Sequence, residues 1–181
     1  MRRAAALLQD VSPTLTTELR GIPYAGSGVV SLGFRLDRFA RPPQGFGMVV
    51  PAREGRDVLA VSYASAKFPG RAPKGSILLR VFVGGALRPE LNRLDDAALT
   101  ELALREVRRI YGIQGEPLTT LVARWNGAMP QYHLGHLERI ARIDAAVAAL
   151  PGLALAGAAY RGVGIPQCIR DGRRAAETVL G

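Results

Sequence analysis

The stretch that decides the fold lies near the C-terminus and reads LALAGAAYRGVGIPQCI at residues 153–169. Leu153–Ala159 is short, wholly apolar and built from small residues, which is typical of a strand that is covered on both faces. Gly162 and Gly164 then form a turn. Pro166 suits the first turn of a helix, because its missing N–H would have no partner there. We therefore predict a strand, a glycine-rich turn and a helix that continues to the last residue.

Such a turn can bind an electron-rich ligand. Glycine at positions 162 and 164 lets the backbone approach a ligand closely and adopt conformations that a side chain would forbid. The helix that follows directs several unpaired N–H groups, and about half a positive charge, at whatever lies over its N-terminus. A phosphate or a flavin ring that becomes negative on reduction would fit. Many α/β folds contain this kind of turn, so the turn alone leaves the ligand open.

Upstream of this segment, the sequence predicts a run of strands joined by short loops. Each candidate strand is rich in β-branched or aromatic residues and is bounded by glycine and proline. Short connections favour antiparallel pairing. The predicted strands are Gly28–Leu36, Met48–Pro51, Val58–Ser65, Ser76–Gly84 and Leu118–Trp125.

Three further segments have the pattern of helices. Residues 1–20 are helical with a break at Ser12-Pro13, and Gly135–Leu150 carries apolar residues along one side. Leu94–Tyr111 is the clearest helix, with Asp95 or Asp96 as its N-cap and Gly112 after its last turn. The fold class is therefore α+β with an α/β element at the C-terminal end.

The composition is that of a globular protein with a basic surface. The chain has 181 residues, of which 48% are hydrophobic and 22% charged. One cysteine excludes an internal disulfide, and two histidines favour no metal site. No apolar run reaches the roughly 18 residues of a membrane span, so we expect a cytoplasmic protein.

A formal net charge of +9 is the unusual feature of the composition. Nucleic acid, anionic lipid or a multiply carboxylated substrate could each explain it. The basic residues are scattered and form no run interleaved with aromatic residues, so we predict no nucleic-acid partner. A solvated basic surface is the simplest interpretation.

Four segments resemble one family in the same order along the chain. Residues 157–169 resemble the C-terminal flavin segment of the protoporphyrinogen and coproporphyrinogen oxidases, which belong to the flavin amine-oxidase superfamily. GFGMVVP at residues 45–51, SAKFPGRAP at residues 65–73 and MPQYHLGH at residues 129–136 resemble further segments of that family.

The resemblance implies an FAD-dependent oxidase that converts protoporphyrinogen or coproporphyrinogen to the porphyrin, with oxygen as the acceptor, in heme biosynthesis. No obligatory catalytic acid or base is apparent in the sequence. The resemblance implies that Val49 and Phe68 enclose the tetrapyrrole substrate. The residues that it places against the flavin are Trp125, Gly157, Gly162, Val163, Gly164 and Ile165.

The family also implies a domain division. Residues 1–20 would end a helical segment of the FAD domain, residues 21–150 would form a substrate-binding domain with a largely antiparallel mixed sheet, and residues 151–181 would supply the last strand and helix of a Rossmann-like FAD domain. The GxGxxG fingerprint that holds the ADP part of FAD does not occur in the sequence. We therefore expect this chain alone to be inactive and to need an N-terminal FAD-binding half, which a separate partner could supply.

Other functions stay open. The chain could be an inactive module that holds a tetrapyrrole or a partner chain through an exposed sheet edge. It could belong to another flavin amine-oxidase-like oxidoreductase, or bind lipid or nucleic acid through its basic surface. Peripheral contact with the inner membrane is implied by the family.

Overall fold

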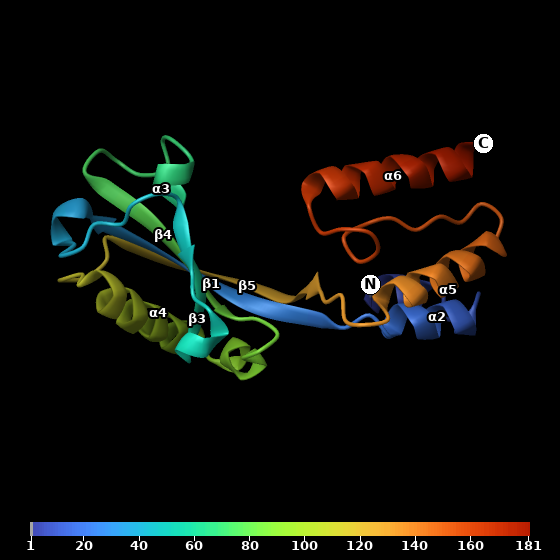
Figure 1. Ribbon diagram of the computed structural model, residues 1–181, viewed down its shortest axis with the longest axis horizontal. Coiled ribbons are helices and arrows are strands. Elements are labelled where there is room, and N and C mark those ends of the chain that lie inside the picture. The colour runs from blue at the N-terminus through green and yellow to red at the C-terminus, as the bar shows by residue number, and fades with distance from the viewer. Residues whose placement is uncertain (1) are drawn as a thin grey trace. The chain divides into compact units, whose positions relative to one another are not determined.

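The computed structural model describes residues 2–181 (Figure 1). The chain divides into two compact units. Residues 25–128 form one of them, which we call the sheet unit. The segment up to residue 24 and residues 129–181 form the other, which we call the terminal unit.

The sheet unit is built on five strands in the spatial order β2-β3-β4-β1-β5. β2 pairs with β3, β3 with β4, and β4 with β1, and all three pairs are antiparallel, which confirms the prediction from the short loops. β5 lies beside β1, where the Leu118 N–H donates to the Gly33 carbonyl at 2.7 Å. The strands are β1 (Tyr24–Arg35), β2 (Gly47–Val49), β3 (Val58–Tyr63), β4 (Ser76–Gly84) and β5 (Thr119–Pro130).

One face of this sheet is packed against helix α4 (Asp96–Tyr111). Figure 1 shows α4 lying along one side of the strands. Successive side chains of a strand point to opposite faces, so alternate residues of β4 enter the core. The buried residues of β4 are Ile77, Leu79, Val81 and Val83, and those of α4 that join them in one cluster are Leu99, Leu102, Ala103, Val107 and Tyr111.

Both ends of α4 lie where the sequence predicts them. The Asp95 carboxylate accepts a hydrogen bond from the Ala98 N–H at 2.8 Å and caps the N-terminus. Gly112 ends the helix in the left-handed region, at φ +63°. Both features confirm the prediction.

A short helix, α3 (Ala64–Lys67), replaces the end of the predicted strand Val58–Ser65. The Ser65 hydroxyl accepts a hydrogen bond from the Leu78 N–H at 3.0 Å, and this bond ties α3 to β4. Three 3₁₀ turns complete the sheet unit: Leu36–Arg38, Ala52–Glu54 and Pro89–Arg93.

The terminal unit is helical, and its helices agree with three predicted segments. Ser12 caps the second helix by accepting from the Leu15 N–H at 3.3 Å, where the break was predicted. Leu15 and Leu19 pack with Ile140 and Ile143 in the core of this unit. The helices are α1 (Arg2–Leu7), α2 (Pro13–Arg20), α5 (His136–Ala148) and α6 (Ile165–Leu180).

The predicted strand at Leu153–Ala159 does not form, and the segment is irregular. A strand is defined by hydrogen bonds to a neighbouring strand, and no strand in the described part of the chain pairs with these residues. Their backbone groups form other hydrogen bonds. The Gly157 N–H, for example, donates to the Asp171 carboxylate at 3.0 Å. The small apolar residues therefore indicated partial burial correctly but not a strand. The predicted helix after the turn is confirmed as α6.

The compact units do not coincide with the predicted domains. Residues 21–24 and 129–150, assigned by sequence to the 21–150 domain, cluster with the two ends of the chain. Which unit binds which ligand stays a prediction. No helix in residues 2–181 is both long and apolar enough to cross a membrane.

Candidate functional site

Three of the predicted site residues share the face of the sheet that is turned away from α4. On β2, Met48 packs against the core, so the next residue, Val49, points to the opposite face. On β5, Val122 packs against the core, so Trp125 lies on that opposite face too. Phe68 follows α3 and lines a groove on the same face. Val49, Phe68 and Trp125 are 78%, 49% and 53% exposed, so each can contact a ligand.

The groove that contains Phe68 has a volume of about 360 Å³. Ser31, Leu78 and Arg80 face it from β1 and β4, where Ser31 is the register partner of Arg80. Leu121 of β5 also lines it. The groove is therefore apolar along much of its wall, with hydroxyl and guanidinium groups between the apolar side chains.

Cations surround the Phe68 ring. The Lys67 Nζ lies 5.9 Å and the Arg71 Cζ 6.0 Å from its centroid. Arg80 lines the same groove, and its Cζ lies 5.5 Å over the Phe82 ring. Among the described residues that line this groove, none is acidic. The groove thus suits an apolar ligand that carries negative charge.

The sequence did not identify Arg71 and Arg80, which line the groove, as site residues. Arg80 occupies an outward position in β4, between buried leucine and valine residues. A single charged residue inside an alternating apolar strand is a usable signal, because such a side chain must stand on the face away from the core.

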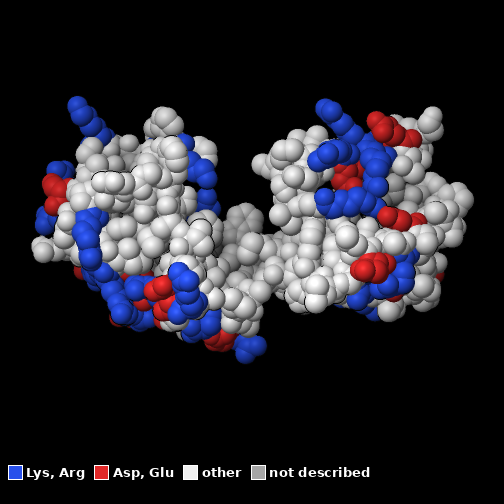
Figure 2. All heavy atoms as spheres, in the orientation of Figure 1, with Lys and Arg blue, Asp and Glu red and all other residues white. Residues whose placement is uncertain are grey.

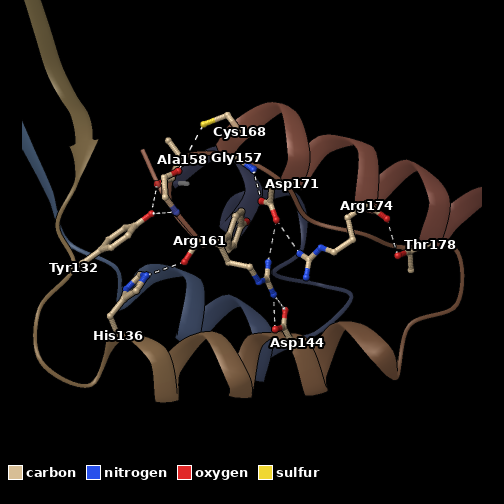
Figure 3. Close-up of polar contacts among 12 residues, drawn as sticks. Tyr132, His136, Asp144, Gly157, Ala158, Arg161, Cys168, Asp171, Arg174 and Thr178 are labelled. Atoms are coloured by element: carbon tan, nitrogen blue, oxygen red, sulfur yellow. Dashed lines mark hydrogen bonds and ion pairs between the residues drawn. The ribbon is translucent and has the colours of Figure 1, made fainter. Parts of the chain in front are cut away.

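In the terminal unit, Tyr132 holds the glycine-rich turn (Figure 3). Its hydroxyl donates to the Ala158 carbonyl at 2.6 Å and accepts from the Gly162 N–H at 2.9 Å. One side chain therefore bridges both ends of the turn.

His136 supports the same turn from α5. Its ring is stacked on that of Tyr132, with centroids 3.9 Å apart and planes at 11°. The His136 Nε2 lies 3.1 Å from the Tyr160 carbonyl oxygen, which can only accept, so this nitrogen carries the proton. The sequence favoured no metal site for the two histidines and indicated no other role for them. His136 instead takes part in the packing that holds the turn in place.

A buried carboxylate fixes the other side of the turn. Asp171 of α6 is only 6% exposed. It accepts from the Gly157 N–H at 3.0 Å, from Arg161 at 3.2 Å and from Arg174 at 2.9 Å. Arg161 also pairs with Asp144 of α5 (Figure 3). Because the charge is compensated by two guanidinium groups, it can remain buried. Asp171 and Arg174 have the i,i+3 spacing of neighbours on one helix face, but nothing in the sequence places Gly157 and Arg161 beside them.

The glycines of the turn are not equivalent. Gly162 has φ +137°, and a Cβ there would lie 2.7 Å from the Gln167 Cγ and 2.8 Å from its Cβ. Gly157 has φ +133°. Gly164 has ordinary extended angles, φ −74° and ψ 151°, and precedes α6 as its N-cap. The prediction that position 164 needs a conformation closed to side chains is therefore wrong, whereas it holds at position 162.

The remaining predicted flavin residues lie at the exposed start of α6. Val163 and Ile165 are exposed. The Gly162 N–H is occupied by Tyr132, but in the described chain the N–H groups of Val163, Gly164 and Ile165 donate no hydrogen bond. These three groups fit the electron-rich edge of a cofactor such as FAD. They belong to the terminal unit, whereas Trp125 belongs to the sheet unit.

Known proteins resemble nearly the whole chain. It is 38% identical over 178 residues to the coproporphyrinogen III oxidase of Propionibacterium freudenreichii subsp. freudenreichii, covering 98% of this chain and 33% of that protein. It is 34% identical over 180 residues to the coproporphyrinogen III oxidase of Bacillus subtilis (strain 168), covering 99% of this chain and 38% of that protein. The chain thus spans about a third of these relatives' length.

The fold matches a crystal structure from Exiguobacterium sp. 255-15, which is provisionally assigned as a protoporphyrinogen oxidase, with a TM-score of 0.83 and 29% identity. The match covers 97% of this chain and 39% of that one. Residues 4–180 match the flavin containing amine oxidoreductases. The chain therefore belongs to the flavin containing amine oxidoreductase family.

Proposed function

We propose that this chain supplies the substrate-binding sheet and the flavin-facing turn of an FAD-dependent oxidase that converts a porphyrinogen to the porphyrin with oxygen as acceptor, in heme biosynthesis. The observation that carries the proposal is the common face of the sheet unit. Val49 and Phe68 were selected from two separate motifs and Trp125 from a position just ahead of a third, and all three stand exposed on that face. The named activities of the relatives support the same conclusion.

On the substrate side, the groove beside Phe68 would receive part of the tetrapyrrole. Phe68, Leu78 and Leu121 offer apolar surface to the macrocycle, which gains free energy by leaving water. The cations around Phe68 would face the carboxylates at the edge of the macrocycle.

On the cofactor side, the start of α6 would lie against the flavin ring. FAD, when bound, supplies the electron acceptor for the substrate. The residues of this chain orient that cofactor: the N–H groups at positions 163–165 face it, and the α6 dipole favours negative charge there. Tyr132 and Asp171 keep the turn in the shape that presents these groups.

The ADP portion of FAD needs a second protein segment. The chain carries no GxGxxG fingerprint, and its relatives are almost three times as long. We propose that an FAD-binding segment equivalent to the rest of these relatives completes the enzyme, and that this chain alone does not turn over substrate.

The basic surface does not favour nucleic acid as the ligand. On the face that Figure 2 shows, lysine and arginine side chains are interspersed with acidic ones. Many arginines are engaged in ion pairs, such as Arg142 with Glu18 at 2.7 Å and Arg108 with Glu116 at 2.7 Å. Charges compensated in this way release few counterions on binding a polyanion.

The proposal is tested by flavin absorbance. The purified chain is mixed with FAD, alone and together with the part of the P. freudenreichii relative that this chain does not cover, and each mixture is passed through a desalting column. We expect FAD to be retained only when both polypeptides are present. A mixture in which the two polypeptides associate but retain no flavin would refute the proposed cofactor site.

A further inference from the structure

We infer that the outer edge of β5 is a docking site for an extended strand, and that the FAD-binding segment that completes the enzyme supplies this strand. The inference rests on the proposed function, because it concerns how that segment meets this chain. It assigns an interaction surface and the kind of partner that fits it.

β5 has an open edge. It lies at one end of the sheet, with β1 on one side and no strand of the described chain on the other. The Leu118 N–H, directly before β5, donates to the Gly33 carbonyl of β1. The N–H groups of successive residues in a strand point to opposite sides, so those of Thr119 and Leu121 point away from β1. This edge therefore offers backbone donors and acceptors with which another strand can pair.

The opposite edge of the same sheet is protected, whereas the edge of β5 is not. β2 is only three residues long and is followed by Pro51 after one further residue. Short strands and prolines both discourage pairing at an edge. β5 is 12 residues long and contains no lysine, and its one proline is its last residue, Pro130. A long edge without these devices is suited to pairing with a further strand.

The single charged side chain of β5 does not guard the edge either. Arg124 pairs with Asp96 of α4 at 2.6 Å and donates to the Leu94 carbonyl at 2.7 Å. Its guanidinium is thereby bound on the side of the sheet that carries α4. A charge that is neutralised within its own chain repels an approaching strand little, so the edge stays available for pairing.

The side chains beside this edge are apolar on both faces of the sheet. On the face turned away from α4, Leu121 and Trp125 are 66% and 53% exposed. On the face that carries α4, Leu104 and Val122 line a groove of about 650 Å³. A strand added to β5 would remove both sets from water, which is favourable. The strand that fits therefore carries apolar residues on both of its own faces, as a strand inside a covered sheet does.

The length of the relatives points to the partner. This chain spans 33% and 38% of the two coproporphyrinogen III oxidases and 39% of the Exiguobacterium structure, whose fold matches 97% of this chain. The greater part of each relative thus lies outside the match and can supply the strand. A second copy of this chain fits less well. Glu101 lines the groove and forms no ion pair among the described residues, and the β5 of a second copy brings only Arg124, which is already bound to Asp96.

The test is hydrogen–deuterium exchange of the full chain, alone and mixed with FAD and the part of the P. freudenreichii relative that it does not cover. In the free chain the outward amides of Thr119 and Leu121 should exchange fast, because no neighbouring strand accepts from them. In the complex we expect both to exchange about a hundredfold more slowly, and the amides of β2 to stay unchanged. The Leu118 amide is the internal reference, because it is already bonded to Gly33.

Leu121→Pro tests the edge by substitution. It removes one outward N–H and leaves the hydrogen bonds to β1 in place. We expect it to weaken association about tenfold, as measured by isothermal titration calorimetry. Leu121→Val is the matched control, because it shortens the side chain but keeps the N–H, and should change the affinity less than about threefold. Circular dichroism checks that both variants are folded. If Leu121→Pro does not fold, the exchange of the wild-type chain decides.

A complex in which Thr119 and Leu121 exchange as fast as in the free chain would overturn the inference, and so would equal protection of β2 and β5. Absence of any association would overturn it too. Protection in the chain alone that grows with its concentration would show that a second copy occupies the edge instead. If β5 is protected but the complex retains no FAD, the inference stands and the proposed oxidase function fails. A complex that retains FAD without protecting β5 gives the reverse.

Discussion

The hydroxyl of Tyr132 accepts a hydrogen bond from the backbone N–H of Gly162 at 2.9 Å, across 30 residues of sequence. The same hydroxyl donates to the Ala158 carbonyl at 2.6 Å. Two of the resembling segments, residues 129–136 and residues 157–169, are thus joined by one side chain. The turn that we propose to face the flavin is not held by its glycines alone.

Tyr132→Phe should loosen this turn without unfolding the terminal unit. Removal of the hydroxyl deletes two hydrogen bonds, each worth about 1 kcal/mol. We expect the Gly162 amide to exchange with solvent roughly tenfold faster, as measured by hydrogen–deuterium exchange. Tyr63→Phe is the control, because it removes a hydroxyl bonded to that of Tyr111 in the sheet unit, at 3.0 Å. Unchanged exchange at Gly162 in Tyr132→Phe would contradict this role.

Gly162→Ala and Gly164→Ala should differ sharply. At Gly162 the alanine would be strained at φ +137° and would collide with the Gln167 Cγ and Cβ. We expect a loss of about 2 kcal/mol in unfolding free energy. At Gly164 the backbone is ordinary and the nearest atom is the terminal Oε1 of the flexible Gln167 side chain, so we expect less than about 1 kcal/mol. Urea denaturation measures both, and equal losses would show that the turn does not depend on the Gly162 conformation.

Asp171→Ala should be among the most destabilising changes in the terminal unit. It leaves Arg161 and Arg174 without their shared carboxylate and the Gly157 N–H without an acceptor. Breaking a buried ion pair by removing one partner costs about 3 kcal/mol, which urea denaturation would detect. Asp10→Ala, at an exposed position in the same unit, is the control and should cost little. A small effect at position 171 would mean that the network is solvated.

The contact between α2 and α5 should weaken in acid. Hydrogen bonding to Arg142, together with the positive charges of Arg142 and Arg139, holds the pKa of Glu18 below its ordinary value of 4.5. A carboxyl whose pKa is lowered by folding stabilises the folded state above the unfolded-state pKa, and this stabilisation is lost as the pH falls through the lowered value.

Glu18→Gln should therefore unfold at a lower temperature than wild type at pH 7, and the difference should shrink as the pH falls below about 4.5. It should also shrink in high salt, because the Arg142 side chain is 53% exposed and its charge is screened. Glu177→Gln removes an exposed carboxyl of α6 and should show neither trend. A difference between Glu18→Gln and wild type that is independent of pH would exclude an ionic origin.

The fold was predictable where local pattern determines structure. β4 was located by its β-branched and aromatic residues between glycine and proline, and α4 by its helical pattern, an aspartate cap at position 95 or 96 and Gly112. The segment Leu153–Ala159 was predicted wrongly, because a strand needs a partner and sequence does not show whether one is present.

Side-chain contacts between residues far apart in the chain could not be predicted from the sequence. The contact between Tyr132 and Gly162 depends on how α5 and the turn pack. Arg174 reaches the Asp171 carboxylate through the helical spacing of α6, whereas Arg161 reaches it through the path of the turn. The motifs did identify Val49, Phe68 and Trp125, which share one face of the sheet, but not the arginines that line the groove with Phe68.

The measurement that tests the central claim most directly is porphyrin formation by the reconstituted enzyme. The chain is combined with FAD and the part of the P. freudenreichii relative that it does not cover, and coproporphyrinogen III is added in air. Porphyrin fluorescence should rise above the rate of spontaneous oxidation only when both polypeptides and FAD are present. A complex that retains FAD but forms porphyrin no faster than the buffer would contradict the account.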